Sequence, residues 1–158
     1  MVIVVRVDDR LLHGQIICAW VPFANADSLL VASDEAASDS LVSDIIEACG
    51  CKGLSVYVKS IEDSVRYVSD TDEADERIIL ITGDLHDAMR IYEKGMRFTS
   101  LNLGNIHHEE NGRKITPSII VNQEDEEIIG RFESLGVKIE IRDVPASKPI
   151  DYRSVKVK

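Results

Sequence analysis

The sequence is short of basic residues and of long apolar runs, and each shortage excludes a class of protein. Its 18 lysines and arginines stand against 28 aspartates and glutamates, which gives a formal net charge of −10. Nucleic acids and acidic membranes bind basic surfaces, so we expect no nucleic-acid partner. No apolar run approaches the roughly 20 residues that cross a bilayer, and acids follow the first apolar stretch where a secretory signal would stay apolar. We therefore predict a cytoplasmic protein.

Cysteine is also scarce, and its spacing does not favour a metal centre. The three cysteines are Cys18, Cys49 and Cys51, and no two of them form the CxxC pair of a zinc site. The triplet "CGC" is compatible with a metal or redox function, but small apolar thiols at the end of a helix explain it more simply. We predict that the protein has no metal site.

The residues that are present have the balance of one globular domain. Hydrophobic residues make up 44% of the 158 residues and charged residues 29%. A chain of this length buries roughly two-thirds of the surface that its unfolded form exposes. The sequence contains no internal repeat, low-complexity tract or linker. We predict a single domain over residues 1–158.

Apolar runs alternate with helical patterns along the whole chain. Strands separated by helices need crossover connections, which favour a parallel sheet covered on both faces. "VIVV" and "IILI" are apolar without alternation, as central strands buried on both sides should be. We predict an α/β fold with a mostly parallel central sheet of about seven strands and helices on both faces. The expected strands are 2–7, 28–32, 54–58, 77–82, 100–103, 118–121 and 137–141, and the helical patterns include 41–49, 85–92 and 128–135.

The stretch "RVDDRLLHGQ" directly follows the first predicted strand and concentrates charged groups there. In an open parallel sheet, ligands bind beyond the carboxyl ends of the strands. A helix that begins near Gln15 would direct its first amides to this place, and such amides bind anions. Arg10 adds a planar cation suited to phosphate oxygens, and His13 supplies a nitrogen nucleophile. Either Asp8 or Asp9 could orient the imidazole or hold Arg10, so the stretch predicts phosphoryl transfer to histidine.

A receiver-like signalling domain is the alternative function. Such a domain also has an acidic pair after its first strand and a hydroxyl residue after its fourth, which Asp8, Asp9 and Thr82 would match. It needs a phosphoacceptor aspartate after the third strand, however, and that strand ends in "YVKS". It also needs a lysine after the fifth strand, where "NLGN" stands.

Four motifs together resemble one protein family. "RVDDRLLHGQIICAW" is similar to the N-terminal signature of the mannose/fructose/sorbose-type IIB components of the bacterial sugar phosphotransferase system. "LLVASDEAASDSL", "NLGNIHHEENGRKI" and "LGVKIEIRDVP" resemble later segments of the same family, and all four occur in the family's order.

The resemblance implies an α/β phosphotransferase with specific partners. A IIB component accepts a phosphoryl group from the phosphohistidine of a IIA domain and passes it to a sugar that enters through the membrane subunits IIC and IID. The carrier histidine would be His13, phosphorylated on Nδ1, with Arg10 as the phosphate-binding arginine and Gly14 and Gln15 beside the phosphoryl group. Asp9 would orient these groups. The resemblance implies no metal and no organic cofactor, and a peripheral position at the permease.

Two departures bear on the sugar. Many family members have a second glycine where this chain has Asn105. An asparagine at this place is typical of the N-acetylgalactosamine branch, so the substrate is either a hexose such as mannose, fructose or sorbose, or an amino sugar. His108 also stands where an aromatic residue is usual.

Several other residues have two interpretations each. Arg6 either belongs to the phosphate site or forms an internal ion pair. Asn102 either forms a turn in "NLGN" or lines the site, and His107, just past that turn, either faces the site or makes a structural hydrogen bond. Trp20 is expected in the core. The tail from Val144 either wraps the surface or reaches a partner.

Overall fold

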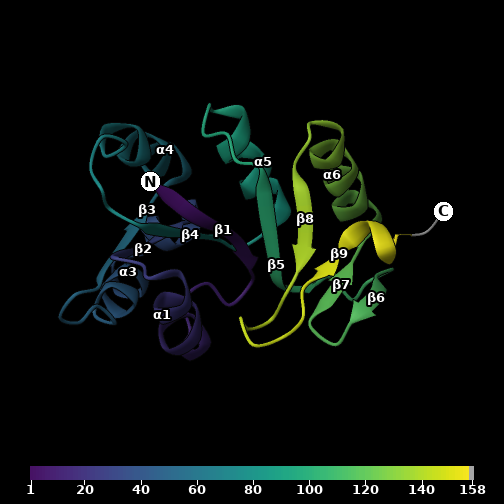
Figure 1. Ribbon diagram of the computed structural model, residues 1–158, viewed down its shortest axis with the longest axis horizontal. Coiled ribbons are helices and arrows are strands. Elements are labelled where there is room, and N and C mark those ends of the chain that lie inside the picture. Colours follow the sequence, from purple (N-terminus) through teal and green to yellow (C-terminus); the bar gives the residue numbers. More distant parts are fainter. Residues whose placement is uncertain (157–158) are drawn as a thin grey trace.

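The computed structural model describes residues 1–156 and forms one sheet with helices on both sides (Figure 1). The strands are β1 (Val2–Asp8), β2 (Ser28–Ala32), β3 (Ser55–Lys59), β4 (Ile78–Thr82), β5 (Ser100–His107), β6 (Arg113–Thr116), β7 (Ile119–Val121), β8 (Lys138–Ile141) and β9 (Ile150–Asp151). The α-helices are α1 (Val21–Ala24), α2 (Asp34–Ser38), α3 (Ser40–Glu47), α4 (Ile61–Asp70), α5 (Leu85–Glu93) and α6 (Gln123–Ser134). A π-helical segment, Ile16–Trp20, precedes α1, and a 3-10 turn, Tyr152–Ser154, follows β9.

The sheet is mostly parallel, as the sequence predicts. Its main path is β3-β2-β4-β1-β5-β7-β6, and β8 branches from β5 and pairs with β9. Among the pairs of named strands within residues 1–156, β6–β7 and β8–β9 are the antiparallel ones. The path places β1 between β4 and β5 at the centre of the fold.

Two apolar cores lie on the two faces of the sheet. In β4, Ile78 and Leu80 belong to the core under α4, α5 and α6, whereas Ile79 and Ile81 belong to the core with Ile16 and Trp20. This alternation is the period-two geometry of a strand buried on both sides. Helices therefore cover both faces, and the predicted α/β architecture is confirmed (Figure 1).

The first strand departs from its predicted burial. "VIVV" was expected to be buried on both faces, yet Val2, Ile3 and Val4 are only partly buried. The reason is the pairing of β1 with β5, which begins only at Arg6. Before that point the two strands diverge, and the apolar side chains of β1 border a groove.

The fifth strand is longer than its sequence pattern suggested. The turn expected at "NLGN" is wrong, because residues 102–105 continue β5 as far as His107. Gly104 serves a close approach and not a turn. A Cβ at this position would overlap the guanidinium of Arg6. The predicted strands did not include β6 or β9, and "ENGRK" forms a turn at Glu110 and Asn111 before the chain enters β6.

The helix ends carry residues that favour helix termini, whereas the apolar face of one predicted helix is only partly buried. Asp84 caps α5, and Gly95 and Gly136 adopt positive φ after α5 and α6. The apolar face expected over 41–49 is wrong in part, because Leu41 and Ile45 of α3 are exposed and only Ile46 packs against the core. The short α3 presents one edge of its apolar stripe to the sheet.

The tail up to residue 156 wraps the domain, which is one of the two predicted alternatives. Ile150 and Asp151 pair with β8, and the Tyr152 side chain is buried in the larger core. Over the described residues, no helix is long and apolar enough to cross a bilayer.

Candidate phosphoryl-acceptor site

The site begins where β1 ends. After Asp8 the chain turns sharply: the Leu11 amide donates to the Asp8 carbonyl at 2.9 Å, and Leu11 adopts a left-handed φ of 55°. A helical run through residues 14–24 then starts directly after His13. This turn brings Arg10 and His13 back over the carboxyl end of β1.

The Asp8 carboxylate is fully buried and gathers the other groups around it. Its Oδ1 accepts from the Arg10 amide at 3.0 Å and from Arg10 Nε at 3.2 Å. Its Oδ2 accepts from Arg6 Nη2 and Arg10 Nη2 at 3.3 Å and from Asn105 Nδ2 at 3.4 Å. Such a buried carboxylate fixes the geometry of every group that it accepts from.

Nε2 of His13 lies 2.8 Å from Oδ2 of Asp8. Burial alone would raise the pKa of Asp8, but the hydrogen bonds from Arg10 and His13 and the charge of Arg6 outweigh it and lower the pKa. The ionised carboxylate can only accept, so the proton of a neutral His13 lies on Nε2 and Nδ1 keeps its lone pair. The His13 side chain is 16% exposed, so the ring reaches the protein surface.

Arg10 lies beside His13 with a half-exposed guanidinium. Its contacts with Asp8 orient the group, and its Nη2 also donates to Gln15 Oε1 at 3.4 Å. Gly14 has open space around the position of a Cβ. The Ile16 amide donates to the His13 carbonyl at 3.1 Å, so the amides of Gly14 and Gln15, which precede it, are the ones that a helix start leaves without a helical acceptor. These two amides and the Arg10 guanidinium adjoin His13 in the chain and are the candidate donors to an anion at this ring.

Arg6 supports the site from inside the protein. Its guanidinium is fully buried, donates to Asn102 Oδ1 at 2.5 Å and to the carbonyls of Arg142 and Asp143, and stacks 4.9 Å from the Trp20 ring. Burial is the main cause that lowers the pKa of Arg6, and its contact with Asp8 works against that cause. Arg6 and Arg10 both face the buried Asp8 carboxylate, and the half-exposed guanidinium of Arg10 is the cation that an approaching anion would meet.

Comparison with known proteins agrees with this geometry. The family model described as PTS system sorbose subfamily IIB component matches residues 2–158. The chain belongs to this family.

Known IIB proteins share both the sequence and the fold. The chain is 32% identical, over 79% of its length and 80% of the relative, to a probable phosphotransferase enzyme IIB component of Streptococcus pyogenes. It is 28% identical to the PTS system mannose-specific EIIAB component of Escherichia coli over 94% of this chain but 47% of the relative, so it spans about half the length of that protein. The crystal structure of a PTS-dependent N-acetyl-galactosamine-IIB component from Streptococcus pyogenes superposes with a TM-score of 0.89 at 26% identity, covering 98% of this chain and 97% of that one.

The structure of this IIB family member brings together most of the predicted site residues. His13, Arg10, Gly14 and Gln15 adjoin one another at the end of β1. Arg6 and Asn102 lie behind them and form an internal network instead of lining the surface, which is the internal ion-pair interpretation for Arg6. Neither interpretation offered for Asn102 is correct, because it stands within β5 and holds Arg6.

The prediction that Asp9 orients the site is wrong for this IIB chain. Its Oδ2 lies 2.8 Å from Nδ1 of His107, so it contacts the other histidine. Asp8 contacts His13 instead, because strand alternation places Asp8 on the same side as Arg6 and turns Asp9 away. His107 thus makes the structural contact that was one of its two interpretations.

Sequence reasoning did not assign Gly104 and Asn105 to the site, although both meet its buried groups. The asparagine was noticed only as a departure from the family pattern, and that departure was the available signal.

No cluster of three or more potential metal ligands occurs in residues 1–156, and the cysteines there are exposed and unpaired. The receiver-like alternative gains no support, because both oxygens of Asp8 are occupied by Arg6, Arg10, His13 and Asn105.

Proposed function

We propose that this chain is a phosphocarrier in which His13 accepts a phosphoryl group on Nδ1 and passes it to a sugar. The donor would be the phosphohistidine of a IIA domain, and the sugar would enter through a IIC/IID permease. The observation that carries the proposal is the 2.8 Å contact between Asp8 and Nε2 of His13, which leaves Nδ1 as the reactive nitrogen.

The proposed transfer needs little covalent chemistry from the protein. Nδ1 of His13 attacks the phosphorus, an N–P bond forms there, and the N–P bond to the donor histidine breaks. The attacking ring acquires positive charge, which the ionised Asp8 stabilises through Nε2–H. When the sugar hydroxyl attacks in the second step, an O–P bond forms, the bond to Nδ1 breaks, the ring returns to its neutral form, and the hydroxyl proton is released to water.

Arg10 and the first amides of the helix would bind the transferring group. The guanidinium offers two nitrogens to phosphoryl oxygens, and charge stabilisation of this kind is the main contribution to phosphoryl transfer. Gly14 allows a phosphoryl oxygen to approach the backbone, since a missing side chain leaves that side open. No metal or cofactor is required by this scheme.

The partners and the sugar follow from the family. A IIA domain and a membrane IIC/IID permease would dock over His13 in turn, which places the protein in the cytoplasm at the inner face of the permease. The sugar is a hexose or an amino sugar. Asn105 and the likeness to an N-acetyl-galactosamine-IIB component support the amino sugar, and the likeness to a mannose-specific EIIAB component supports a hexose.

The test is phosphorylation by the upstream carriers in vitro. The wild-type protein should become labelled on one histidine, and 31P and 15N spectra should assign the phosphoryl group to Nδ1 of His13. His13→Ala should abolish labelling, whereas the matched control His86→Ala, an exposed histidine that contacts Glu124, should not. Equal label in the His13→Ala variant would refute the proposal. A label that is lost in base and survives acid would point to an aspartyl phosphate instead.

A further inference from the structure

The buried Trp20 side chain has a charged neighbour. The guanidinium carbon of Arg6 lies 4.9 Å from the centre of the Trp20 ring. Nε1 of the ring donates to the Asp143 carbonyl at 3.0 Å, and Nη2 of Arg6 donates to the same oxygen at 3.1 Å. The indole therefore contacts the cation through its ring and also holds one of the acceptors that the cation uses.

The other contacts of Arg6 leave this buried cation incompletely compensated. Its ion-pair partner within residues 1–156 is Asp8, and Asp8 is paired with Arg10 as well. Its Nε has no hydrogen-bond acceptor in the described part of the chain. A buried cation is costly unless its charge and its donors are met. The electron-rich face of an indole attracts a cation within about 6 Å, and most strongly where water is excluded.

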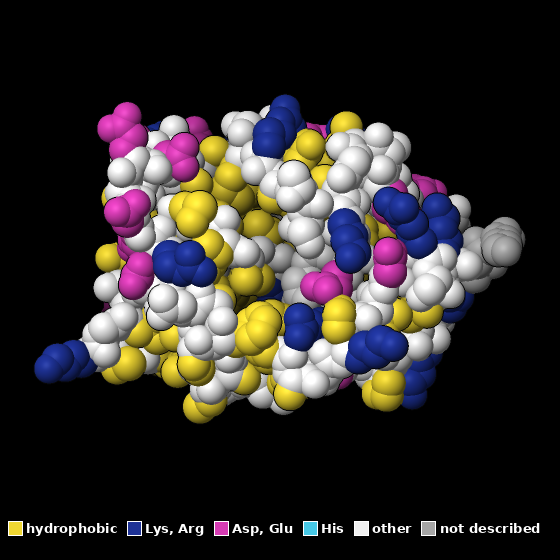
Figure 2. Space-filling view, viewed as in Figure 1, with side chains coloured by type: hydrophobic (Ala, Val, Ile, Leu, Met, Phe, Trp, Pro, Cys, Tyr) yellow, Lys and Arg dark blue, Asp and Glu magenta, His cyan; other side chains and the backbone are white. Residues whose placement is uncertain are grey.

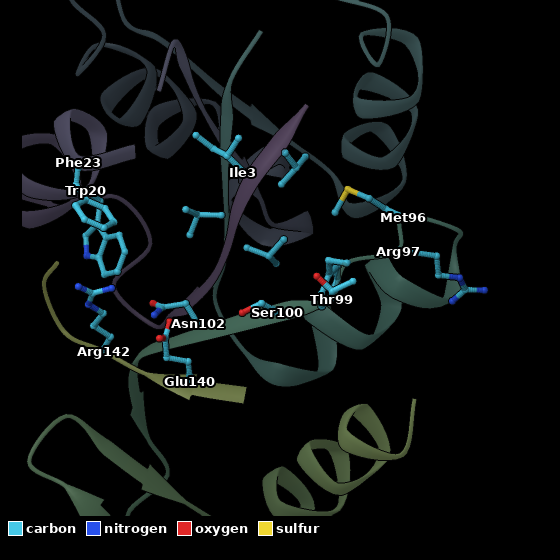
Figure 3. Close-up of a pocket in the computed structure, with 14 residues that line it drawn as sticks. Ile3, Trp20, Phe23, Met96, Arg97, Thr99, Ser100, Asn102, Glu140 and Arg142 are labelled. Atoms are coloured by element: carbon cyan, nitrogen blue, oxygen red, sulfur yellow. The ribbon is translucent and has the colours of Figure 1, made fainter. Parts of the chain in front are cut away.

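Trp20 also separates the guanidinium of Arg6 from water. A groove of about 410 Å³ lies between the first half of β1 and the start of β5, and Figure 2 shows hydrophobic side chains gathered in a hollow on this face. Trp20 and Asn102 line the groove, whereas Arg6, which contacts both of them, does not. Figure 3 shows Trp20 and Asn102 at the same end of the groove, next to Arg142. Trp20 is 3% exposed and Asn102 is 5% exposed, so the two side chains form a wall between the cation and the solvent.

We propose that Trp20 is a positioning residue for phosphoryl transfer and that it acts on Arg6 through the π face of its ring. The contacts form a continuous path. The indole holds the guanidinium, the guanidinium donates to Oδ2 of Asp8 at 3.3 Å, and the same oxygen lies 2.8 Å from Nε2 of His13. A weaker hold on Arg6 would let Asp8 and the His13 ring leave the geometry that transfer needs. This inference rests on the proposed function, since it concerns the same reaction.

Apolar packing is the competing explanation for Trp20. The indole meets the Phe23 ring edge-on, with the ring centres 6.0 Å apart, and it belongs to the smaller core with Ile16. A substitution such as Trp20→Leu would leave a cavity and also remove the π face, so it cannot separate the two roles. Fluorination of the ring can. Fluorine is close to hydrogen in size, and each fluorine withdraws electron density from the ring face and weakens its attraction for a cation.

The test replaces Trp20, the only tryptophan in the chain, by monofluoro-, difluoro- and trifluorotryptophan through nonsense suppression. The rate at which the upstream carrier phosphorylates His13 should fall with each added fluorine, by at least about threefold for the trifluoro ring. The 15N shift of His13 Nε2 should change in the same order, because this nitrogen reports the contact with Asp8. Fluorine makes the indole N–H a stronger donor, so the hydrogen bond to Asp143 would act in the opposite direction.

Two controls separate the contact with Arg6 from other effects of fluorine. A second cation lies near the ring, since the guanidinium carbon of Arg142 is 5.9 Å from its centre. Arg142→Gln removes that cation but keeps the backbone carbonyl that accepts from Arg6, and the rate should still fall with fluorine in this variant. Two monofluoro isomers with the fluorine at different ring positions should slow transfer alike, because they differ in steric fit more than in the charge of the ring face.

A rate that does not depend on the number of fluorines, in a protein that is labelled on His13, would overturn the role of Trp20 and leave the proposed function intact. A fluorine effect that disappears in Arg142→Gln, or that follows the position of the fluorine and not the number, would overturn it as well. Wild-type protein that is not labelled on His13 would overturn both proposals. Circular dichroism and urea unfolding verify that each protein folds, and if the trifluoro protein does not, the monofluoro and difluoro proteins decide the result.

Discussion

His13 Nε2 and the fully buried Oδ2 of Asp8 lie 2.8 Å apart, and this contact determines which ring nitrogen is free to react. The carboxylate holds the imidazole in one tautomer and one orientation. Because Asp8 is held by Arg6 and also by Asn105 from within the sheet, the orientation of His13 depends in part on a residue, Asn105, that is far from it in sequence. The histidine is thus positioned by the strand end and not by its own loop alone.

Substitution Asp8→Asn should slow phosphorylation of His13 by about 10²-fold or more. An amide can donate as well as accept, so it no longer fixes the proton on Nε2, and it cannot stabilise an imidazolium. Transfer rates from the upstream carrier and 15N shifts of the His13 ring measure both effects. Asp9→Asn is the matched control, since that carboxylate contacts His107. A wild-type rate in a folded Asp8→Asn variant would contradict the role given to Asp8.

Substitution Arg10→Gln should reduce the transfer rate by about 10² to 10³ while changing the free energy of unfolding by less than about 1 kcal/mol. The side chain is half-exposed, so its ion pair with Asp8 adds little stability, whereas its charge acts on the transferring phosphoryl group. Quenched-flow transfer reactions measure the rate, and urea unfolding measures the free energy of unfolding, so the two effects are separated. Arg66→Gln, an exposed arginine of α4, should leave both unchanged. If Arg10→Gln transfers as fast as wild type, the guanidinium does not bind the phosphoryl group.

The sequence predicted those parts of the fold that depend on local pattern. Non-alternating runs such as "IILI" marked a strand buried on both faces, and the apolar spacing over residues 85–92 marked α5. The cluster after β1 was predicted for the same reason, because Arg10 and His13 are close in sequence.

What escaped prediction depends on contacts between distant segments. Strand alternation puts Asp8 on the side of Arg6, but the contacts of Asp8 with Asn105 and of Asp9 with His107 arise only because β1 pairs with β5. The divergence of β1 from β5, and with it the groove, likewise arises from the arrangement of strands and leaves no mark in "VIVV".

Substitution Gly104→Ala should destabilise the protein by about 1–3 kcal/mol and also slow transfer. A Cβ at this position overlaps the guanidinium of Arg6, which must then move away from Asp8. Urea unfolding and the phosphorylation rate of the same preparation test both consequences. In contrast, Gly130→Ala in α6 meets no atom within 4 Å and should stabilise by about 0.5–1 kcal/mol through helix propensity. Equal stability of the two variants would show that Arg6 does not require the glycine.

Tyr152 should make the stability of the protein depend on pH in alkaline solution. Burial, followed by the charge of Glu126, raises the pKa of Tyr152 from 10.0 to about 12. The folded state therefore favours the neutral phenol, and this stabilisation is complete below the unfolded pKa of 10.0 and is lost as the pH rises through about 12. Tyr152→Phe removes the titrating group but leaves Tyr67, whose pKa is also raised, in both proteins.

The stability difference between wild type and Tyr152→Phe isolates this effect. Below about pH 10 the difference should be constant, and it should shift against the wild type as the pH rises further, because only the unfolded wild-type chain gains an ionised phenol at this position. Urea unfolding at closely spaced pH values measures the difference, and absorbance of the tyrosinate follows the titration directly. A flat difference up to about pH 12, or ionisation of Tyr152 at its ordinary pKa, would mean that the contacts with Glu126 and Arg113 do not hold the tail in place.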